Sequence, residues 1–119
     1  MNTESEKETL ENARLVEDLH ASADEAAALM KTLSNTARLM ILCQLVEGER
    51  SVSELEKHLE TKQPNVSQQL ARLRMEGCVN TRRDGRTIYY SLADTRVASV
   101  IRNLHQTFCP VNDGPTSAG

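Results

Sequence analysis

Aromatic side chains are scarce in this 119-residue sequence: tryptophan is absent, and aromatic residues make up 3% of the chain. Proteins that bind single-stranded nucleic acid stack its bases on aromatic side chains, so the composition argues against that class. No apolar run reaches the roughly 18 residues of a membrane-spanning helix. Residues 1–9 are polar and acidic, without the basic and apolar regions of a secretory signal. We therefore expect a cytoplasmic protein with no membrane partner.

Motifs for catalysis are missing as well. The sequence has no glycine-rich phosphate loop, and no set of acid and base side chains accompanies a cysteine. We predict that the protein is not an enzyme and needs no cofactor. The three cysteines, Cys43, Cys78 and Cys109, are an odd number, which disfavours a framework of disulfides in a reducing compartment. Packed thiols, metal ligands or reactive thiols remain as interpretations.

The charges are distributed unevenly along the chain. The formal net charge is -3, but residues 1–28 hold eight acidic and two basic residues, whereas residues 62–86 hold six basic and two acidic residues. Because the choice of a partner depends on the local electrostatic field, the second segment is a candidate surface for nucleic acid. Charge alone is equally consistent with a solvated face.

Hydrophobic periodicity predicts five or six helices between a disordered N-terminus at 1–8 and a flexible tail at 111–119. Two segments, Ser22–Glu25 and Ser51–Glu54, have the serine and glutamate spacing of a capping box at a helix start. Pro64 is suited to the first turn of a further helix, because its missing amide hydrogen is not needed there.

A hairpin and a last helix follow. Asp84-Gly85 lies between two β-prone runs, which predicts two strands joined by a two-residue type I′ turn. An apolar stripe from Val97 to Phe108 predicts the last helix. The order is that of a winged helix-turn-helix domain, mainly α with a β-hairpin, which we place at residues 9–110. Such a small domain favours a homodimer formed through its first and last helices.

The helix expected from about Pro64 to Glu76 has one polar face. Asparagine and glutamine can bond to adenine in the major groove, and a helix enters that groove with its N-terminal half. Arginines at the hairpin tip can contact phosphate or enter a minor groove. The partner is therefore predicted to be double-stranded DNA, and the candidate contact residues are Gln63, Asn65, Ser67, Gln68, Gln69, Arg72, Arg82, Arg83 and Arg86.

The three thiols have different local patterns. Cys78 directly follows a helix stop at Gly77 and is expected to be a buried packing residue, and the local pattern at Cys43 also favours packing. Cys109 lies near the end of the last helix, where reactivity explains a thiol better than burial does. His105 and Cys109 share a helix face and could chelate a metal with Cys43, but no further ligand completes a zinc site.

Several segments together resemble ArsR-type winged-helix regulators, over roughly residues 22–110. The matching segments are Leu33-Ser34-Asn35-Thr36-Ala37-Arg38-Leu39, Ser51-Val52-Ser53-Glu54-Leu55, Ser67-Gln68-Gln69-Leu70-Ala71-Arg72-Leu73-Arg74, Glu76-Gly77 and Thr87-Ile88-Tyr89-Tyr90-Ser91-Leu92. Within that family, Ile41-Leu42-Cys43 and Cys109-Pro110 resemble the sulfide-responsive BigR, SqrR and HlyU branch.

The resemblance implies a mechanism. In that branch two cysteines react with persulfide or polysulfide, become bridged through extra sulfur, and release DNA so that sulfide-oxidation genes are expressed. Carried onto this sequence, the sensing thiols are Cys43 and Cys109. Metal-sensing relatives have Cys-x-Cys on the helix at 53–58, or repeated Asp and His on the last helix. This sequence lacks both patterns, so no metal site is expected.

Other functions remain open at this point. The pair could form a direct disulfide or bind a metal as a general redox-responsive or metal-responsive regulator. A thiol enzyme is disfavoured by the missing acid and base partners. A plain interaction module would lack salt-dependent binding to duplex DNA.

Overall fold

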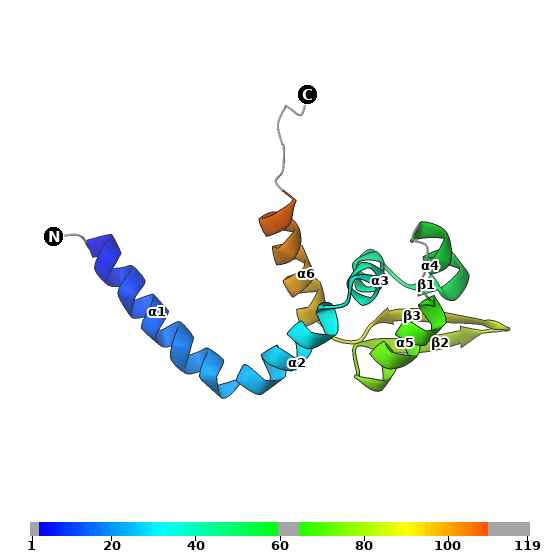
Figure 1. Ribbon diagram of the computed structural model, residues 1–119, viewed down its shortest axis with the longest axis horizontal. Coiled ribbons are helices and arrows are strands. Elements are labelled where there is room, and N and C mark those ends of the chain that lie inside the picture. The colour runs from blue at the N-terminus through cyan, green and yellow to red at the C-terminus, as the bar shows by residue number, and fades with distance from the viewer. Residues whose placement is uncertain (1–2, 60–64, 110–119) are drawn as a thin grey trace, which may run out of the picture. The chain divides into compact units, whose positions relative to one another are not determined.

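The computed structural model describes residues 3–59 and 65–109, which belong to two compact units divided between Ser34 and Asn35 (Figure 1). The first unit contains α1 (Thr3–Ala21) and α2 (Ala23–Leu33). The second contains α3 (Thr36–Val46), β1 (Arg50–Ser51), α4 (Val52–His58), α5 (Val66–Met75), β2 (Val79–Asp84), β3 (Thr87–Leu92) and α6 (Thr95–Phe108). No helix in the described ranges is long and apolar enough to span a bilayer.

The N-terminal helix begins earlier than the sequence suggests. Helix α1 starts at Thr3, inside the stretch 1–8 for which we expect disorder. The physical reason is composition, since the chain has neither glycine nor proline before Gly48 and is rich there in glutamate, alanine and leucine, which favour helix. The end of the domain at 110 and the tail at 111–119 lie outside the described residues.

The two predicted capping boxes have different outcomes. At Ser51 both bonds form: the Glu54 carboxylate accepts from the Ser51 amide at 2.8 Å, and the Ser51 hydroxyl oxygen accepts from the Glu54 amide at 3.2 Å. At Ser22 the prediction is wrong, because the side chain makes no cap bond. The Ser22 amide already donates to the carbonyl of Leu19 at the end of α1, so it has no hydrogen left for Glu25.

The second unit has the winged helix-turn-helix arrangement predicted from the sequence. Helix α3 contacts α4, α5, α6 and β3, and α5 contacts β2 (Figure 1). The sheet is antiparallel with the order β1-β3-β2, and its two-residue edge strand β1 was not expected from the sequence. Helix α5 is thereby held beside the hairpin of β2 and β3, which forms the wing.

The hairpin turn differs from the expected type. Asp84 pairs with Thr87, so the two central residues are Gly85 and Arg86. Only Gly85 has a positive φ, of 65°, and no other residue type has one among the described residues. A type I′ turn requires positive φ at both central positions, whereas type II′ requires it only at the first, where glycine is favoured. The signs therefore agree with type II′.

Helix α6 packs by the first part of its apolar stripe. Val97, Ala98 and Ile101 are buried, and the helix contacts α3 and β3. Phe108, at the end of the stripe, is 73% exposed. Part of the stripe that the sequence assigns to a dimer interface thus lies in the core of the second unit.

Substitution of Leu70 by alanine should destabilise the protein strongly. Leu70 is fully buried on α5, so removal of its side chain loses apolar contacts and leaves a cavity. We expect a loss of about 2–5 kcal/mol in the free energy of unfolding, measured by urea denaturation. Met75→Ala on the same helix is the matched control, because Met75 is 80% exposed. Equal losses for the two variants would contradict the packing of α5.

Candidate DNA-binding surface and thiol pair

The outer face of α5 carries the predicted contact residues. Val66, Leu70 and Leu73 are buried, which turns Ser67, Gln68 and Arg72 to the exposed side, while Gln69 is half-buried. The side-chain oxygen of Asn65 accepts from the amide of Gln68 at 3.1 Å and caps the helix. Its amide group can still donate to DNA. Gln63 lies outside the described residues.

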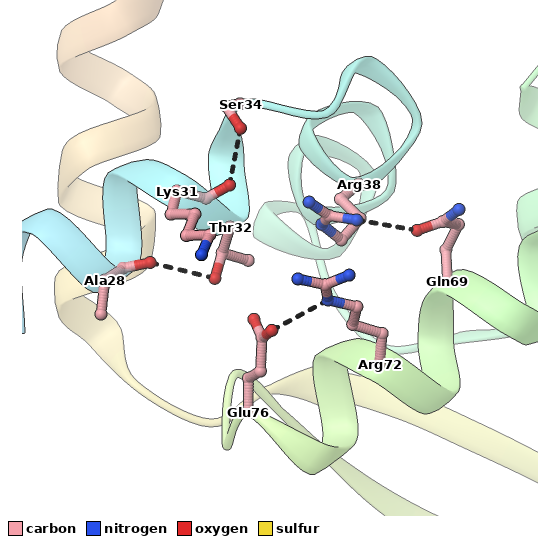
Figure 2. A network of polar contacts seen from close by, with 8 residues as sticks. All are labelled: Ala28, Lys31, Thr32, Ser34, Arg38, Gln69, Arg72 and Glu76. Carbon is pink, nitrogen blue, oxygen red and sulfur yellow. Dashed lines mark hydrogen bonds and ion pairs between the residues drawn. The ribbon is translucent and has the colours of Figure 1, made fainter.

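Gln69 is oriented by a buried arginine of α3. Arg38 is 7% exposed, and its Nη1 donates to Oε1 of Gln69 at 3.2 Å. Figure 2 shows the two side chains pointing toward each other across α3 and α5. Because guanidinium groups only donate, Gln69 must turn its oxygen to Arg38, which leaves its NH₂ group for an acceptor. Arg38, Gln68, Gln69, Ala71, Arg72 and Met75 line an open groove on this surface.

Removal of the Gln69 side chain should test this orientation. We expect Gln69→Ala to lower the free energy of unfolding by about 1–3 kcal/mol, because a donor of the buried Arg38 loses its partner. Gln68→Ala is the matched control and should cost less than about 0.5 kcal/mol, since Gln68 is exposed. Urea denaturation measures both variants. If Gln69→Ala costs no more than the control, Arg38 does not depend on Gln69.

The four arginines among the predicted contact residues differ in their availability. Nε of Arg72 donates to Glu76 at 2.9 Å within α5 (Figure 2). Arg82 pairs with Glu49, which precedes β1, with its Nη2 at 2.7 Å from Oε1. Within residues 3–59 and 65–109, neither Arg83 nor Arg86 has an ion pair, and both are exposed. Arg83 and Arg86 are thus the wing cations most open to phosphate.

The two candidate sensing thiols lie in the same unit. Cys43 is half-buried on α3, and Cys109 is exposed at the C-cap of α6, where its amide donates to the carbonyl of His105 at 2.9 Å. Burial first, and then the charge of Cys109, raise the pKa of the Cys43 thiol. Helix α3, which carries Cys43, contacts α6, which ends beside Cys109.

Cys78 has a different environment. It is 8% exposed, and its pKa is raised by burial and by the carboxylates of Glu76 and Asp94. All three cysteines are free thiols. Across the part of the chain that the structure describes, no three histidine, cysteine, aspartate or glutamate side chains gather as a metal site.

Two functional features were not found from the sequence. Arg38 lies in a segment that resembles the family, but nothing in its periodicity predicts a bond to Gln69. The partnership of Glu49 with Arg82 joins residues 33 positions apart, and no local pattern indicates it. Both depend on how α3, α5 and the sheet pack together.

Known proteins are similar to this chain in sequence and in fold. Residues 35–81 match the family described as "Bacterial regulatory protein, arsR family". The chain is 47% identical over 93 residues to the biofilm growth-associated repressor of Xylella fastidiosa, covering 78% of this chain and 82% of that protein. It is 40% identical over 97 residues to the transcriptional activator HlyU of Vibrio cholerae, covering 82% and 90%. The crystal structure of the transcriptional repressor BigR from Xylella fastidiosa is similar, with a TM-score of 0.75, 46% identity and coverage of 80% and 97%.

Proposed function

Because this chain belongs to the arsR family of bacterial regulatory proteins, we propose that it is a transcriptional repressor whose operator binding is switched off by sulfur chemistry at Cys43 and Cys109. A homodimer binds an inverted repeat, with one α5 in each of two successive major grooves and the wing on the adjacent backbone. The named repressor of Xylella fastidiosa supports the direction of regulation.

One observation carries the DNA-binding part of the proposal. The exposed polar face of α5 and the exposed Arg83 and Arg86 of the wing belong to the same compact unit (Figure 1). A helix with Ser67 and Gln68 can hydrogen-bond to base edges, and the two arginines can neutralise phosphates.

Selection of bound duplexes from a random-sequence library tests this part. We expect the reduced protein to recover an inverted repeat and to bind it more weakly as salt rises. Failure to recover any duplex, or affinity that is independent of salt, would reject DNA binding. A reporter gene behind the recovered site then separates repression from activation, the role in the name of HlyU.

The dimer part has support in α1. Its apolar side chains are exposed within one chain: Leu10 71%, Leu15 58%, Val16 63% and Leu19 51%. Burial of such a face against a second copy removes apolar area from water. We propose that the first helix and the outer end of α6 form the interface. Sedimentation of the protein should give twice the mass of one chain, and a monomer at all concentrations would reject this part.

The thiol part rests on the contact between the two helices that carry the cysteines. Cys43 lies on α3, which contacts α6, and the charge of Cys109 acts on Cys43. The exposed Cys109 is the more accessible of the two to a sulfur donor in solution. We propose that Cys109 reacts first and that the half-buried Cys43 closes the bridge.

The reaction balances with an organic trisulfide, R–S–S–S–R, as the oxidant. The Cys109 thiolate attacks the central sulfur and forms Cys109–S–S–S–R, and one RS⁻ leaves. The Cys43 thiolate then attacks the sulfur next to Cys109 Sγ, and the second RS⁻ leaves. The products are Cys109–S–S–S–Cys43 and two RSH, since the two released thiolates take up the two thiol protons. The bridge ties the end of α6 to α3, whose partner α5 faces the DNA.

A direct disulfide is the second candidate, because it would join the same two thiols. Intact mass separates the outcomes after treatment with trisulfide or peroxide. A sulfur bridge adds one sulfur and removes two hydrogens, a disulfide only removes two hydrogens, and a metal adds its own mass.

A further inference from the structure

The wing is joined to the loop before β1 by a bidentate ion pair. Nε and Nη2 of Arg82 donate to the two carboxylate oxygens of Glu49 at 3.0 Å and 2.7 Å. Two parallel bonds between a guanidinium fork and a carboxylate fix the relative orientation of both groups, which a single contact does not. The bond from Arg82 lowers the pKa of Glu49, and the carboxylate is therefore charged at neutral pH.

Tyr89 completes this contact from the middle strand. Arg82 on β2 is paired in register with Tyr89 on β3, and Tyr89 is in turn paired with Ser51 on β1. The guanidinium carbon of Arg82 lies 4.8 Å from the centre of the Tyr89 ring, which is the range of a cation–π interaction. Arg82 and Tyr89 thus connect β2 and β3 to Glu49 in the loop before β1, and we call these three residues the wing latch.

The wing latch changes the roles of the wing arginines. The positive charge of Arg82 is balanced by Glu49. Arg83 follows on β2 and Arg86 lies in the turn; both are exposed, and neither has an ion pair in the described part of the chain. The strand β1 is only two residues long, so its backbone pairing alone holds the loop weakly to the hairpin.

We propose that the wing latch sets the direction of the wing relative to the helices, and that Arg83 and Arg86, rather than Arg82, contact the DNA backbone. Glu49, Tyr89 and Arg82 are thus positioning residues. This inference rests on the proposed binding of duplex DNA, and it assigns to Glu49 an effect opposite to that of a simple repulsive charge. An acidic residue near DNA weakens binding through repulsion, but a latch residue strengthens binding by keeping the wing in place.

The first experiment compares Glu49→Gln with Glu47→Gln, using a duplex recovered by selection from the random library. Glu47 is the matched control, because it lies in the same loop and also pairs with an arginine, Arg50, at 3.2 Å. We expect Glu49→Gln to bind about three- to tenfold more weakly, because the released wing must be ordered on binding. Glu47→Gln should stay within about twofold of the unchanged protein. Tighter binding by Glu49→Gln would overturn the proposal.

The second experiment separates positioning from a direct phosphate contact by the salt dependence of affinity. Arg86→Gln should reduce the slope of log K against log salt by about one, since one phosphate contact is lost. In the Glu49→Gln background the same change should have a smaller effect, because the wing no longer holds Arg86 in place. A variant that was merely less stable would not change the effect of Arg86→Gln on the salt slope. If Arg86→Gln has the same effect with and without Glu49→Gln, the latch is overturned.

Arg82→Lys provides the conservative comparison, because it keeps the charge and loses the fork. We expect it to weaken binding as Glu49→Gln does and to leave the salt slope intact. Normal affinity for Arg82→Lys, with a reduced slope for Arg82→Gln, would make Arg82 a phosphate contact and overturn the proposal. Thermal melts show that each variant is folded. If the unchanged protein binds no duplex, the proposed function fails instead of the latch.

Discussion

Replacement of Cys43 by serine should abolish release of DNA by an organic trisulfide. The bridge needs two sulfurs, so Cys43→Ser can carry a sulfur adduct at Cys109 but cannot tie α6 to α3. We expect the unchanged protein to lose operator affinity by at least about tenfold on treatment, which corresponds to a coupling of about 1.4 kcal/mol. The variant should keep its affinity, measured by fluorescence anisotropy with the selected duplex.

Two further variants make this result specific. Cys109→Ser should behave like Cys43→Ser, because it removes the other end of the bridge. Cys78→Ser should still respond, since Cys78 is buried in the segment that joins α5 to β2 and has no part in the proposed pair. Release of DNA from both single variants of the pair would reject the bridge as the switch. If only Cys78→Ser loses the response, the reactive thiol is Cys78 and the proposed pair is wrong.

The rate of bridge closure should rise with pH. Burial, the larger cause of the raised pKa of Cys43, persists after Cys109 has lost its charge in the adduct, so the Cys43 thiolate is scarcer at neutral pH than that of an ordinary cysteine. Because the thiolate is the nucleophile, closure should keep accelerating as the pH climbs through the ordinary range of cysteine. Mass spectrometry of samples quenched at successive times, which separates the adduct from the bridge, measures the rate of closure by Cys43. A rate that levels off near neutral pH would contradict a raised pKa at the closing thiol.

Gln68→Ala should weaken operator binding strongly without unfolding the protein. Its side chain is exposed, and a bidentate contact from glutamine to a base is worth about 1–3 kcal/mol of discrimination. We therefore expect a loss of about 5–150-fold on the selected duplex. The fold should be intact, because the bond to the Asn65 cap uses the backbone amide of Gln68, which alanine retains.

The duplex itself supplies the control for this prediction. On a duplex of unrelated sequence Gln68→Ala should bind as the unchanged protein does, since only a base contact has been removed. Arg86→Gln should weaken both duplexes about equally, because phosphate contacts do not depend on sequence. An equal loss for Gln68→Ala on both duplexes would show that Gln68 does not contact bases.

Local patterns were enough for most elements of this fold, but they missed the short edge strand β1 and the start of α1. The Ser51–Glu54 capping box, the stripe of Val66, Leu70 and Leu73, and the glycine in the hairpin turn each act over a few residues. Their order along the chain then permits few arrangements, and the winged helix-turn-helix is one of them. The capping box predicted at Ser22 does not form, because the Ser22 amide already donates to the carbonyl of Leu19 at the end of α1.

One of the few aromatic side chains makes a contact that local patterns do not predict. Tyr89 is one of two tyrosines in the sequence, and its ring lies against the guanidinium group of Arg82. A tyrosine paired across strands with an arginine is a short-range feature, but the sequence alone does not give the register that pairs them.

The sequence by itself determined the helices, the hairpin, the polar face of α5 and the resemblance that selects Cys43 and Cys109. Tertiary structure alone decided which of those polar groups are already engaged: Gln69 by Arg38, Arg82 by Glu49, and Cys43 by burial and the charge of Cys109. The physical reason is the range of the interactions. Caps and periodic stripes act within a few residues, whereas these contacts join residues more than 30 positions apart, which only packing brings together.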